Sequence, residues 1–388
     1  MHLLDHLLAQ NGDRELFAIV VERLADLFEP RLCQSYAELF SEVIARRIPE
    51  LHAEHLLARY QRIRKPRGFD RDADSIQNIF VLSRVTLGAD VAITSILLDA
   101  AKKRFPNAAI WFTGPKKSWE LFAADPRLRH LSLAYGRGGS IADRLSIWPQ
   151  VRDAVCLPRS IVIDPDSRLT QLGLLPLCAE EAYYFFESRA YAAETSQPLP
   201  ELTRRWVAET FGVSAARPYI ATGLAAARFA TTVSFGVGEN PSKRIADPFE
   251  AELLRRLPRP ILIDKGAGGE EAVRVERAVA KAGGDGIVMW DGSFAGFAAH
   301  IQNSRIFVGY DSAGGHVAAA CGFPMISVFA GAVSDRMFQR WRPTGDGVIE
   351  VIRPENMSLP ELLSTFEDRL QRVSLSSDRP EAGLASQT

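Results

Sequence analysis

The sequence has 388 residues, of which 47% are hydrophobic and 24% are charged, a composition typical of soluble globular proteins. The formal net charge is −1, because 46 Lys and Arg residues stand against 47 Asp and Glu residues. This balance gives no overall attraction to nucleic acid or to an anionic membrane, and the length predicts two or three domains rather than one.

The four cysteines are scattered and form no CxxC pair. They lie among apolar residues, which is typical of buried free thiols in a reducing compartment. No apolar run is long enough to cross a bilayer, and the first residues do not resemble a signal peptide. We therefore expect a cytoplasmic protein, and peripheral contact with the inner face of the membrane stays open.

Residues 1–70 carry apolar residues at helical spacing in four segments, which Pro30 and Pro49 interrupt. This pattern predicts a small all-α module of three or four helices. The polar run RKPRGFDRDAD ends the module.

From residue 76 onward, short apolar runs alternate with amphipathic segments, a pattern typical of parallel sheets with helices on both faces. One such series predicts a doubly wound domain over 76–215, although residues 180–228, including EEAYYFFESRAY, are expected to be mostly helical. A second series predicts another doubly wound domain over 229–355. The fold class is therefore α/β, with ligands expected at the carboxyl ends of the strands, in a cleft between the halves. Residues 374–388 are polar and predicted to be disordered.

One stretch, FVGYDSAGGHVAAACG, places Asp311, Ser312, Gly314, Gly315 and His316 between an expected strand and an expected helix. A helix that begins after such a turn offers free N–H groups and the positive end of its dipole to a phosphate. A capped strand-to-helix connection without a ligand explains the same residues about equally well.

Two further turns of the second series fall at strand ends. SFGVGENPSKRI places Lys243 and Arg244 after a pair of glycines, which suits a diphosphate, although it matches neither GxGxxG nor the Walker pattern. Taken alone, Lys243 and Arg244 can also be explained as solvated charges on the surface, without a ligand. KGAGGEE places Glu270 and Glu271 at a helix start, where a carboxylate either complements the helix dipole or binds ribose hydroxyls.

In the first series, the turn TLGADVAITS places Gly88 and Asp90 between a strand and a helix. Asp90 is either an N-cap or a general base that takes a proton from an acceptor hydroxyl. Asp164 and Asp166 form a DxD pair in VIDPDS, a spacing that can hold a metal-bound nucleotide but also arises by chance.

Taken together, these segments resemble glycosyltransferase family nine, the lipopolysaccharide heptosyltransferases. YDSAGGHVAAACGFPMISVFAG is similar to that family's DSGxxHxAAAxGxPxxxLFG signature, and TLGADVAITSILLDAAKKRFPNAAIWF resembles its LGDxxxTxPxLxxLKxxxPxAxI segment. FGVGENPSKRI resembles the family's lysine turn, KGAGGEE its acidic turn, and IVIDPDSRL its IDLQGSxRS strand, which makes the DxD pair part of a core strand. The resemblance covers about residues 76–353 and does not account for residues 1–70.

The resemblance implies a GT-B fold of two Rossmann-like domains that face a cleft. It also implies an inverting, metal-independent transfer from a nucleotide sugar without a cofactor, with a heptose as one candidate sugar. The implied acceptor is a hydroxyl of a glycan, a lipid-linked glycan or a protein, and no nucleic acid is implied. The roles that it implies are a general base at Asp90, nucleoside binding at Glu270, a turn-shaping role for Gly88 and His316, and binding of the donor diphosphate by Lys243, Asp311, Ser312, Ala313, Gly314 and Gly315.

The sequence also departs from the family pattern. LGAD is one residue longer than the family's LGD, and Ala313 stands where the family has glycine. The helical module over 1–70 is not usual for heptosyltransferases, and it suggests another substrate, a docking partner or self-association. The alternative to a transferase is therefore a catalytically weak nucleotide-sugar-binding or scaffolding protein of the same fold.

Overall fold

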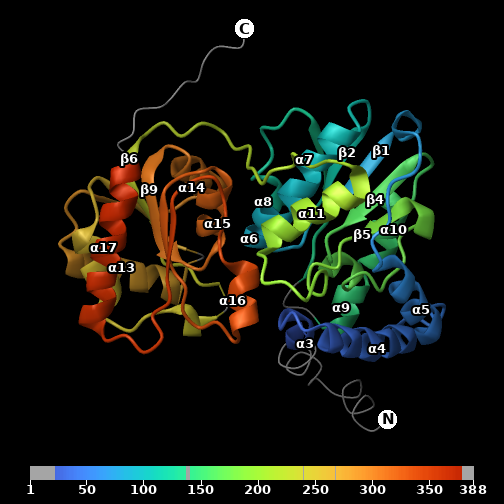
Figure 1. Ribbon diagram of the computed structural model, residues 1–388, viewed down its shortest axis with the longest axis horizontal. Helices are drawn as coiled ribbons and strands as arrows, with labels where there is room; N and C mark the ends of the chain where they lie inside the picture. The colour runs from blue at the N-terminus through green and yellow to red at the C-terminus, as the bar shows by residue number, and fades with distance from the viewer. Residues whose placement is uncertain (1–21, 137–139, 239, 267, 378–388) are drawn as a thin grey trace. The chain divides into compact units, whose positions relative to one another are not determined.

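The computed structural model describes residues 22–136, 140–238, 240–266 and 268–377 (Figure 1). Contacts between residues divide the chain into two compact units. Unit 1 comprises the described residues up to Ala221 together with Val333–Trp341, and unit 2 comprises Thr222–Ala332 together with the described residues from Arg342 onward.

Unit 1 is built on a five-stranded sheet in the order β3-β2-β1-β4-β5, and every pair of neighbouring strands is parallel. Its central strands are continuous apolar runs buried on both faces, as helices on both sides of a sheet require. Because β1 lies between β2 and β4, the strand order reverses there, which is where α/β sheets bind ligands. The strands are β1 (Asn78–Leu82), β2 (Ala109–Gly114), β3 (Leu128–Ser132), β4 (Ser160–Asp164) and β5 (Tyr183–Phe185).

The helices of unit 1 connect these strands or lie before and after them. They are α3 (Glu22–Asp26), α4 (Pro30–Arg47), α5 (Ala53–Ile63), α6 (Leu87–Ala89), α7 (Ser95–Arg104), α8 (Lys116–Trp119), α9 (Ile141–Leu145), α10 (Trp148–Val155), α11 (Leu199–Phe211) and α16 (Asp335–Trp341), with a π-helical turn η3 (Asp90–Thr94) and short 3-10 turns η2 (Ala73–Ser75), η4 (Arg168–Thr170) and η5 (Glu180–Ala182).

The N-terminal helices share the hydrophobic core of the unit 1 sheet. Figure 1 shows α4 and α5 in blue along one side of unit 1, near α9 and α10. Pro30 starts α4 at a position where proline is favoured, since its missing N–H has no intrahelical partner there. The helices expected before residue 22 lie outside the described residues. The shared core includes Tyr36, Phe40 and Ile44 of α4, Leu56 and Tyr60 of α5, and Phe80, Leu82 and Val162 of the sheet.

The segment EEAYYFFESRAY, expected to be helical, is instead a 3-10 turn followed by the edge strand β5. Tyr183, Tyr184 and Phe185 are all buried, and aromatic residues fit a pleated, buried surface better than a helix. The prediction was wrong because a three-residue strand is too short to show a periodicity. The helical prediction holds further on, where α11 ends at Gly212 in the left-handed conformation.

Unit 2 contains a six-stranded parallel sheet in the order β11-β10-β9-β6-β7-β8. Its strand order reverses between β6 and β9, which pair side by side. Its elements are β6 (Phe229–Ser234), η6 (Pro241–Lys243), α12 (Phe249–Arg256), β7 (Ile261–Asp264), α13 (Glu270–Ala282), β8 (Ile287–Trp290), α14 (Phe294–Ile301), β9 (Ser304–Tyr310), α15 (Ala313–Ala320), β10 (Met325–Val328), β11 (Ile349–Ile352) and α17 (Leu359–Ser377).

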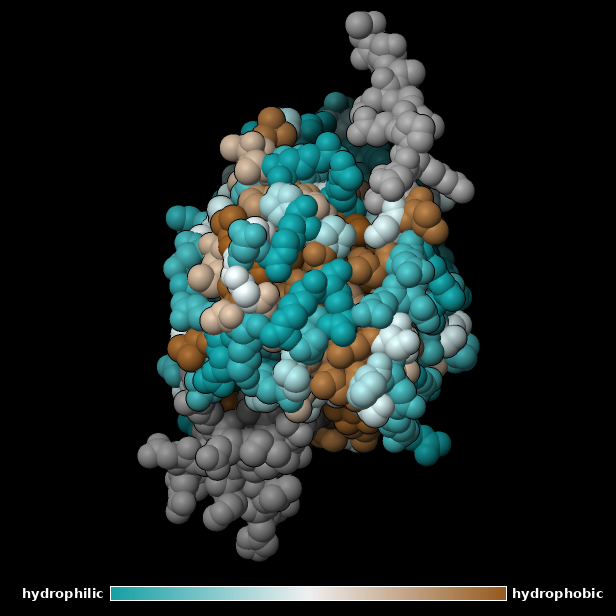
Figure 2. All heavy atoms as spheres, turned by 90° about the vertical axis from the view of Figure 1, so that its left-hand side faces the viewer, coloured by the Kyte–Doolittle hydropathy of each residue, from teal (hydrophilic) through white to brown (hydrophobic). Residues whose placement is uncertain are grey.

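One face of unit 2 mixes hydrophilic and hydrophobic residues. Figure 2 shows this side of the molecule, where hydrophobic side chains lie among hydrophilic ones.

Helix α17 continues to Ser377, four residues into the range expected to lack structure, because the buried Val373 extends its apolar face. Residues 378–388 lie outside the described residues. Within the described residues, no helix has the length and apolar character needed to cross a membrane.

Candidate functional site

The turns after β6 and β9 bring Lys243 and Asp311 together in unit 2. Because these strands are neighbours, residues 68 positions apart in the sequence meet at one sheet edge. The Lys243 ammonium forms an ion pair with the Asp311 carboxylate, and its Nζ also lies 3.5 Å from the Asp311 carbonyl oxygen. Only 19% and 9% of the two side chains are exposed. The predicted phosphate-binding lysine and the predicted aspartate therefore form one group.

His316 lies in α15 beside this pair and is buried. Burial lowers the pKa of His316 below its ordinary value of 6.5; the Asp311 carboxylate opposes this shift, and the Lys243 ammonium adds to it. The imidazole is therefore neutral at pH 7. The turn-shaping role expected for His316 stays a prediction.

Ser312 occupies the position immediately before α15, with an extended backbone. A serine there normally accepts a hydrogen bond from the first turn of the helix, but its side chain makes no such bond. Its Oγ is buried and has no hydrogen-bond partner among the described residues. Together with the free N–H groups of the first helical turn, which begins with Ala313, this hydroxyl is a donor available to a ligand.

Packing accounts for one of the predicted ligand-approach glycines. A Cβ atom on Gly314 would lie 2.7 Å from the Phe307 ring, whereas one on Gly315 would meet its nearest atom, on Met325, at 3.3 Å. Gly314 therefore lets α15 pack closely against β9, and this requirement is independent of any ligand.

Of the two glutamates in the acidic turn, Glu271 points toward the edge of the sheet. Glu270 begins α13 and is exposed. The Glu271 carboxylate lies 3.6 Å from the Arg244 guanidinium. Gly266 has a left-handed backbone, and a Cβ atom there would lie 2.3 Å from the Glu271 carboxylate, so the turn requires glycine. Sequence reasoning chose Glu270, but the contact with Arg244 belongs to its neighbour.

In unit 1, Asp90 is completely buried at the carboxyl end of β1. Its carboxylate accepts hydrogen bonds of 2.7 Å from the Ser83 hydroxyl, the Arg84 backbone N–H and the Thr94 hydroxyl. Burial raises the pKa of Asp90, while these donors and the Ser118 hydroxyl oppose the shift. In this conformation, the carboxylate holds the β1 turn together.

The extra residue of LGAD is accommodated by a widened helical turn. Gly88 lies in the single turn α6, and Asp90 begins the π-helical turn η3 before α7. One inserted residue in a helix produces such a π turn, and π turns are frequent at functional sites.

The DxD pair takes part in contacts inside unit 1. Asp164 accepts hydrogen bonds from the Ser167 backbone N–H, the Thr170 hydroxyl and the Tyr183 hydroxyl. Asp166 forms an ion pair of 2.7 Å with Arg189. Both carboxylates therefore organise the loop after β4, as expected of a core strand and its turn.

Comparison with known proteins finds a family match for the part of the chain from just before α13 to the start of α17. Residues 268–364 match the model of glycosyltransferase family 9, the heptosyltransferases. This segment, about a quarter of the chain, is thus similar to family 9 glycosyltransferases. No protein of curated function matches the sequence.

Solved structures of heptosyltransferases and of a family 9 glycosyltransferase share the fold of about three quarters of this chain. E. coli heptosyltransferase WaaC with ADP has a TM-score of 0.56 at 15% identity, with 76% of this chain and 100% of that chain covered. A family 9 glycosyltransferase from Veillonella parvula has 0.56 at 14% identity, with 77% and 97% covered. E. coli ADP-heptose heptosyltransferase II has 0.55 at 16% identity, with 78% and 100% covered. These matches confirm the expected fold class, and the family match supports glycosyltransferase activity.

Sequence reasoning did not identify the buried arginines of unit 1. Arg84 and Arg189 lie at the carboxyl ends of β1 and β5 with about 5% exposed. An arginine after an apolar strand is a weak signal, because most such arginines lie on the surface. Only the sheet order shows that these two residues meet.

Proposed function

We propose that this protein is an inverting glycosyltransferase that takes a sugar from a nucleoside diphosphate donor. The observation that carries the proposal is the group formed by Lys243, Asp311 and the start of α15. It combines a cation, an unpartnered hydroxyl and free backbone N–H groups at the switch point of the unit 2 sheet. ADP-heptose is the donor we propose, since similar structures are described with ADP or with ADP-2-deoxy-2-fluoro heptose.

The proposed mechanism depends on stabilising the departing diphosphate. As the bond from the sugar to the phosphate breaks, negative charge builds on the phosphate oxygens. Lys243 has three N–H donors, of which Asp311 takes two, through its carboxylate and its carbonyl oxygen, so the third can contact the diphosphate. The first-turn N–H groups of α15 and the Ser312 hydroxyl supply neutral donors. Each fixed donor of this kind contributes about 3 kcal/mol to a developing anion, which lets the transfer proceed without a metal ion.

Asp311 suits the sugar better than the phosphate. An ionised carboxylate only accepts hydrogen bonds, and sugar hydroxyls are donors, whereas phosphate oxygens would repel it. We therefore place Asp311 against the transferred sugar and Lys243 against the diphosphate. Glu271 is assigned to the nucleoside ribose together with the originally predicted Glu270.

Lys243→Ala tests the donor site. We expect this variant to bind ADP about tenfold to a hundredfold more weakly, because a hydrogen bond to a charged group contributes about 1.5–3 kcal/mol. Isothermal titration calorimetry measures the effect. Lys265→Ala is the matched control, since Lys265 is a lysine that follows the adjacent strand β7 and pairs with Glu276 and Asp291. Equal ADP affinity in both variants would contradict the phosphate assignment.

Asp90→Asn tests the general base. A base must come within hydrogen-bond distance of the acceptor hydroxyl, so the carboxylate has to exchange one of its donors for the acceptor. As a base, Asp90 would contribute about a hundredfold to ten-thousandfold to turnover. We expect sugar transfer from ADP-heptose to fall by that factor while ADP affinity stays unchanged. Unchanged turnover would remove Asp90 from this role.

A catalytically weak nucleotide-sugar-binding protein is the second candidate function. The specific observation in its favour is that Asp90 is fully buried and already accepts bonds from Ser83, Arg84 and Thr94. This candidate predicts ADP binding that depends on Lys243, with no transfer by the unmutated protein. Measuring donor hydrolysis and transfer alongside ADP binding separates the two functions.

The acceptor and the cellular location are the remaining parts of the proposal. We propose a bacterial cell-surface glycan of the lipopolysaccharide type as the acceptor class, with a lipid-linked glycan or a protein as alternatives. The reaction would take place in the cytoplasm or at the inner face of the membrane. The naming of heptosyltransferase II as a lipopolysaccharide enzyme supports this class. Incubating the protein with ADP-heptose and each acceptor class, and detecting transfer by mass spectrometry, identifies the acceptor.

A further inference from the structure

The backbone of Ile245, two residues after Lys243, is bonded on both sides by side chains. Its N–H donates to the Tyr310 hydroxyl oxygen at 3.2 Å, and its carbonyl oxygen accepts a bond of 2.8 Å from the Arg274 guanidinium. Tyr310 is the last residue of β9, and Arg274 lies in α13. We call residues 240–245 the lysine turn. Two elements of unit 2 therefore hold the end of this turn that leads toward α12.

A buried carboxylate orders these two side chains. Glu250, at the start of α12, is only 1% exposed. It accepts a hydrogen bond of 3.1 Å from the Tyr310 hydroxyl and bonds of 2.9 and 3.0 Å from Nε of Arg274. Burial and the Glu250 charge raise the pKa of Tyr310 above its ordinary value, so the hydroxyl stays protonated and donates to the carboxylate. Since a hydroxyl has one proton to donate, its oxygen is left to accept from the Ile245 N–H.

The other end of the lysine turn is held as closely. The Asn240 side-chain oxygen caps η6 by accepting a bond of 3.1 Å from the Ser242 backbone N–H. A Cβ atom on Gly331, in the segment after β10, would lie 2.5 Å from the Ser242 carbonyl oxygen. Gly331 also has a left-handed backbone, so this close approach requires glycine. The backbone on both sides of Lys243 is thus fixed by contacts within unit 2.

Tyr310 connects the two halves of the proposed donor site. Asp311, which forms the ion pair with Lys243, is its immediate neighbour in the chain. Through its hydroxyl, the same tyrosine holds the lysine turn. Its buried ring packs against Phe235 and Phe249, with centroid distances of 5.7 and 6.4 Å. The separation between the lysine turn and the start of α15 therefore depends on one fixed phenol ring.

We propose that Tyr310 is a positioning residue of the donor site, which holds the Lys243 ammonium where it meets the donor diphosphate, with Glu250 and Arg274 as its supports. This role rests on the proposed function and deepens it. A lysine side chain is a flexible stem, so its direction depends on the backbone that carries it. A cation that is already in place costs less to order when the ligand binds. Removing the Tyr310 hydroxyl should therefore weaken ADP binding, although the effect passes through Lys243.

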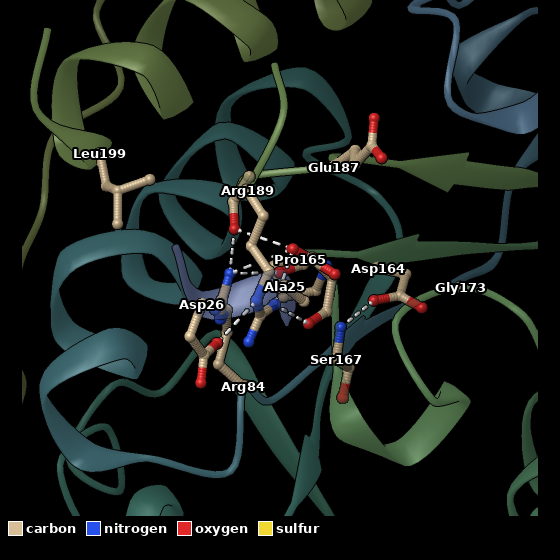
Figure 3. A network of polar contacts seen from close by, with 12 residues as sticks. Ala25, Asp26, Arg84, Asp164, Pro165, Ser167, Gly173, Glu187, Arg189 and Leu199 are labelled. Carbon is tan, nitrogen blue, oxygen red and sulfur yellow. Dashed lines mark hydrogen bonds and ion pairs between the residues drawn. The ribbon is translucent and has the colours of Figure 1, made fainter. Parts of the chain in front are cut away.

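The test compares Tyr310→Phe with Tyr183→Phe. Tyr183 is the matched control in unit 1, because each tyrosine is 1% exposed and the Tyr183 hydroxyl donates to the buried carboxylate of Asp164. Figure 3 shows this carboxylate with the bond that it accepts from the Ser167 backbone N–H. Both variants should lose stability against urea, but only Tyr310→Phe should bind ADP more weakly, by about threefold to tenfold in calorimetry. Equal ADP affinity in the two variants would overturn the proposal.

A double-mutant cycle with Lys243→Ala shows whether Tyr310 acts through the lysine. Substitutions that act through one contact are not additive, so Tyr310→Phe should change ADP affinity by less than about twofold in the Lys243→Ala background. A second loss of full size would contradict the route through Lys243. Unchanged affinity in Lys243→Ala alone would remove the donor site and the positioning role together. A loss there without one in Tyr310→Phe would remove only the positioning role.

Arg274→Lys tests the second bond to the lysine turn while it keeps the charge. Lysine can still pair with Glu250, but it lacks the planar fork that reaches the Ile245 carbonyl oxygen at the same time. We expect ADP affinity to fall about threefold to tenfold. Arg256→Lys is the matched control, because Arg256 is also 28% exposed and donates at 2.7 Å to both the carboxylate and the carbonyl oxygen of Glu252. If these two lysine variants bind ADP equally well, Arg274 does not support the site.

Discussion

The carboxyl edges of the two sheets each place an aspartate near a helix start, but they differ in how fully their polar groups are bonded. In unit 1, Asp90 is completely buried and accepts bonds from two hydroxyls and a backbone N–H. In unit 2, Asp311 has one cationic partner, Lys243, and the adjacent Ser312 hydroxyl has no partner among the described residues. The unit 2 edge therefore has donors to offer a ligand, and the unit 1 edge uses its donors internally.

This difference also predicts which substitutions change the stability of the protein and which change its affinity for a ligand. Buried charges that satisfy one another are costly to break, because the remaining partner is left uncompensated. Donors kept for a ligand cost little to remove from the ligand-free protein. Apart from Asp90, which is tested as the general base, substitutions of these charged groups in unit 1 should therefore act mainly on folding, and substitutions in unit 2 mainly on affinity.

The largest effect is expected from Asp166→Asn. Asparagine tolerates the left-handed backbone of this position, so the change isolates the charge, and it leaves Arg84 and Arg189 with less compensation. We expect the free energy of unfolding to fall by about 3–5 kcal/mol, measured by urea denaturation. Asp153→Asn, which removes an exposed partner of Arg152, should change it by less than about 1 kcal/mol. Comparable losses in both variants would contradict the comparison.

The sequence predicted the sheets better than the edge contacts. Long alternating segments such as the one that forms β1 and α7 identified both doubly wound halves, because their periodicity is strong. The short strand β5 was missed because Tyr183, Tyr184 and Phe185 carry no pattern of their own.

For the site, local turn chemistry indicated Lys243 and Asp311 correctly as neighbours of one edge, since both follow strands. It selected Glu270, whereas the carboxylate that lies near Arg244 belongs to Glu271. The two residues are adjacent at the start of a helix, and the sequence does not show which of their side chains points toward the edge of the sheet. Nor did it indicate that Asp26 meets Arg189, 163 positions away. Contacts at that separation depend on how the chain folds back, which the local sequence does not record.

A second prediction concerns the pH dependence of unit 1. Burial raises the pKa of Glu187 from 4.5 to about 7, although Arg64 and Tyr60 oppose the shift. The folded protein therefore binds this proton more tightly than the unfolded chain does. Its contribution to stability is complete below about pH 4.5 and is lost as the pH rises through 7, a decrease of up to about 3 kcal/mol.

Glu187→Gln should remove most of this pH dependence. Urea denaturation at pH 5 and pH 8 measures the difference in unfolding free energy for each variant. Glu180→Gln is the control. Glu180 pairs at the exposed surface with Arg62, which lies two residues before Arg64, near the end of α5. If Glu187→Gln and the unmutated protein lose the same stability between these pH values, Glu187 does not titrate in this range.

The smallest expected effect gives the sharpest separation of the two edges. Ser312→Ala removes a hydroxyl that caps nothing, so the stability loss of about 1 kcal/mol usual for a lost N-cap should be absent. ADP affinity should nevertheless fall about threefold to tenfold, because a neutral hydrogen bond contributes about 0.5–1.5 kcal/mol. Ser140→Ala supplies the opposite case in unit 1, since Ser140 caps α9 in a capping box with Asp143. That variant should lose stability and keep its ADP affinity. A stability loss in Ser312→Ala with unchanged ADP binding would mean that this hydroxyl serves the fold, and that the edge of unit 2 is bonded as internally as that of unit 1.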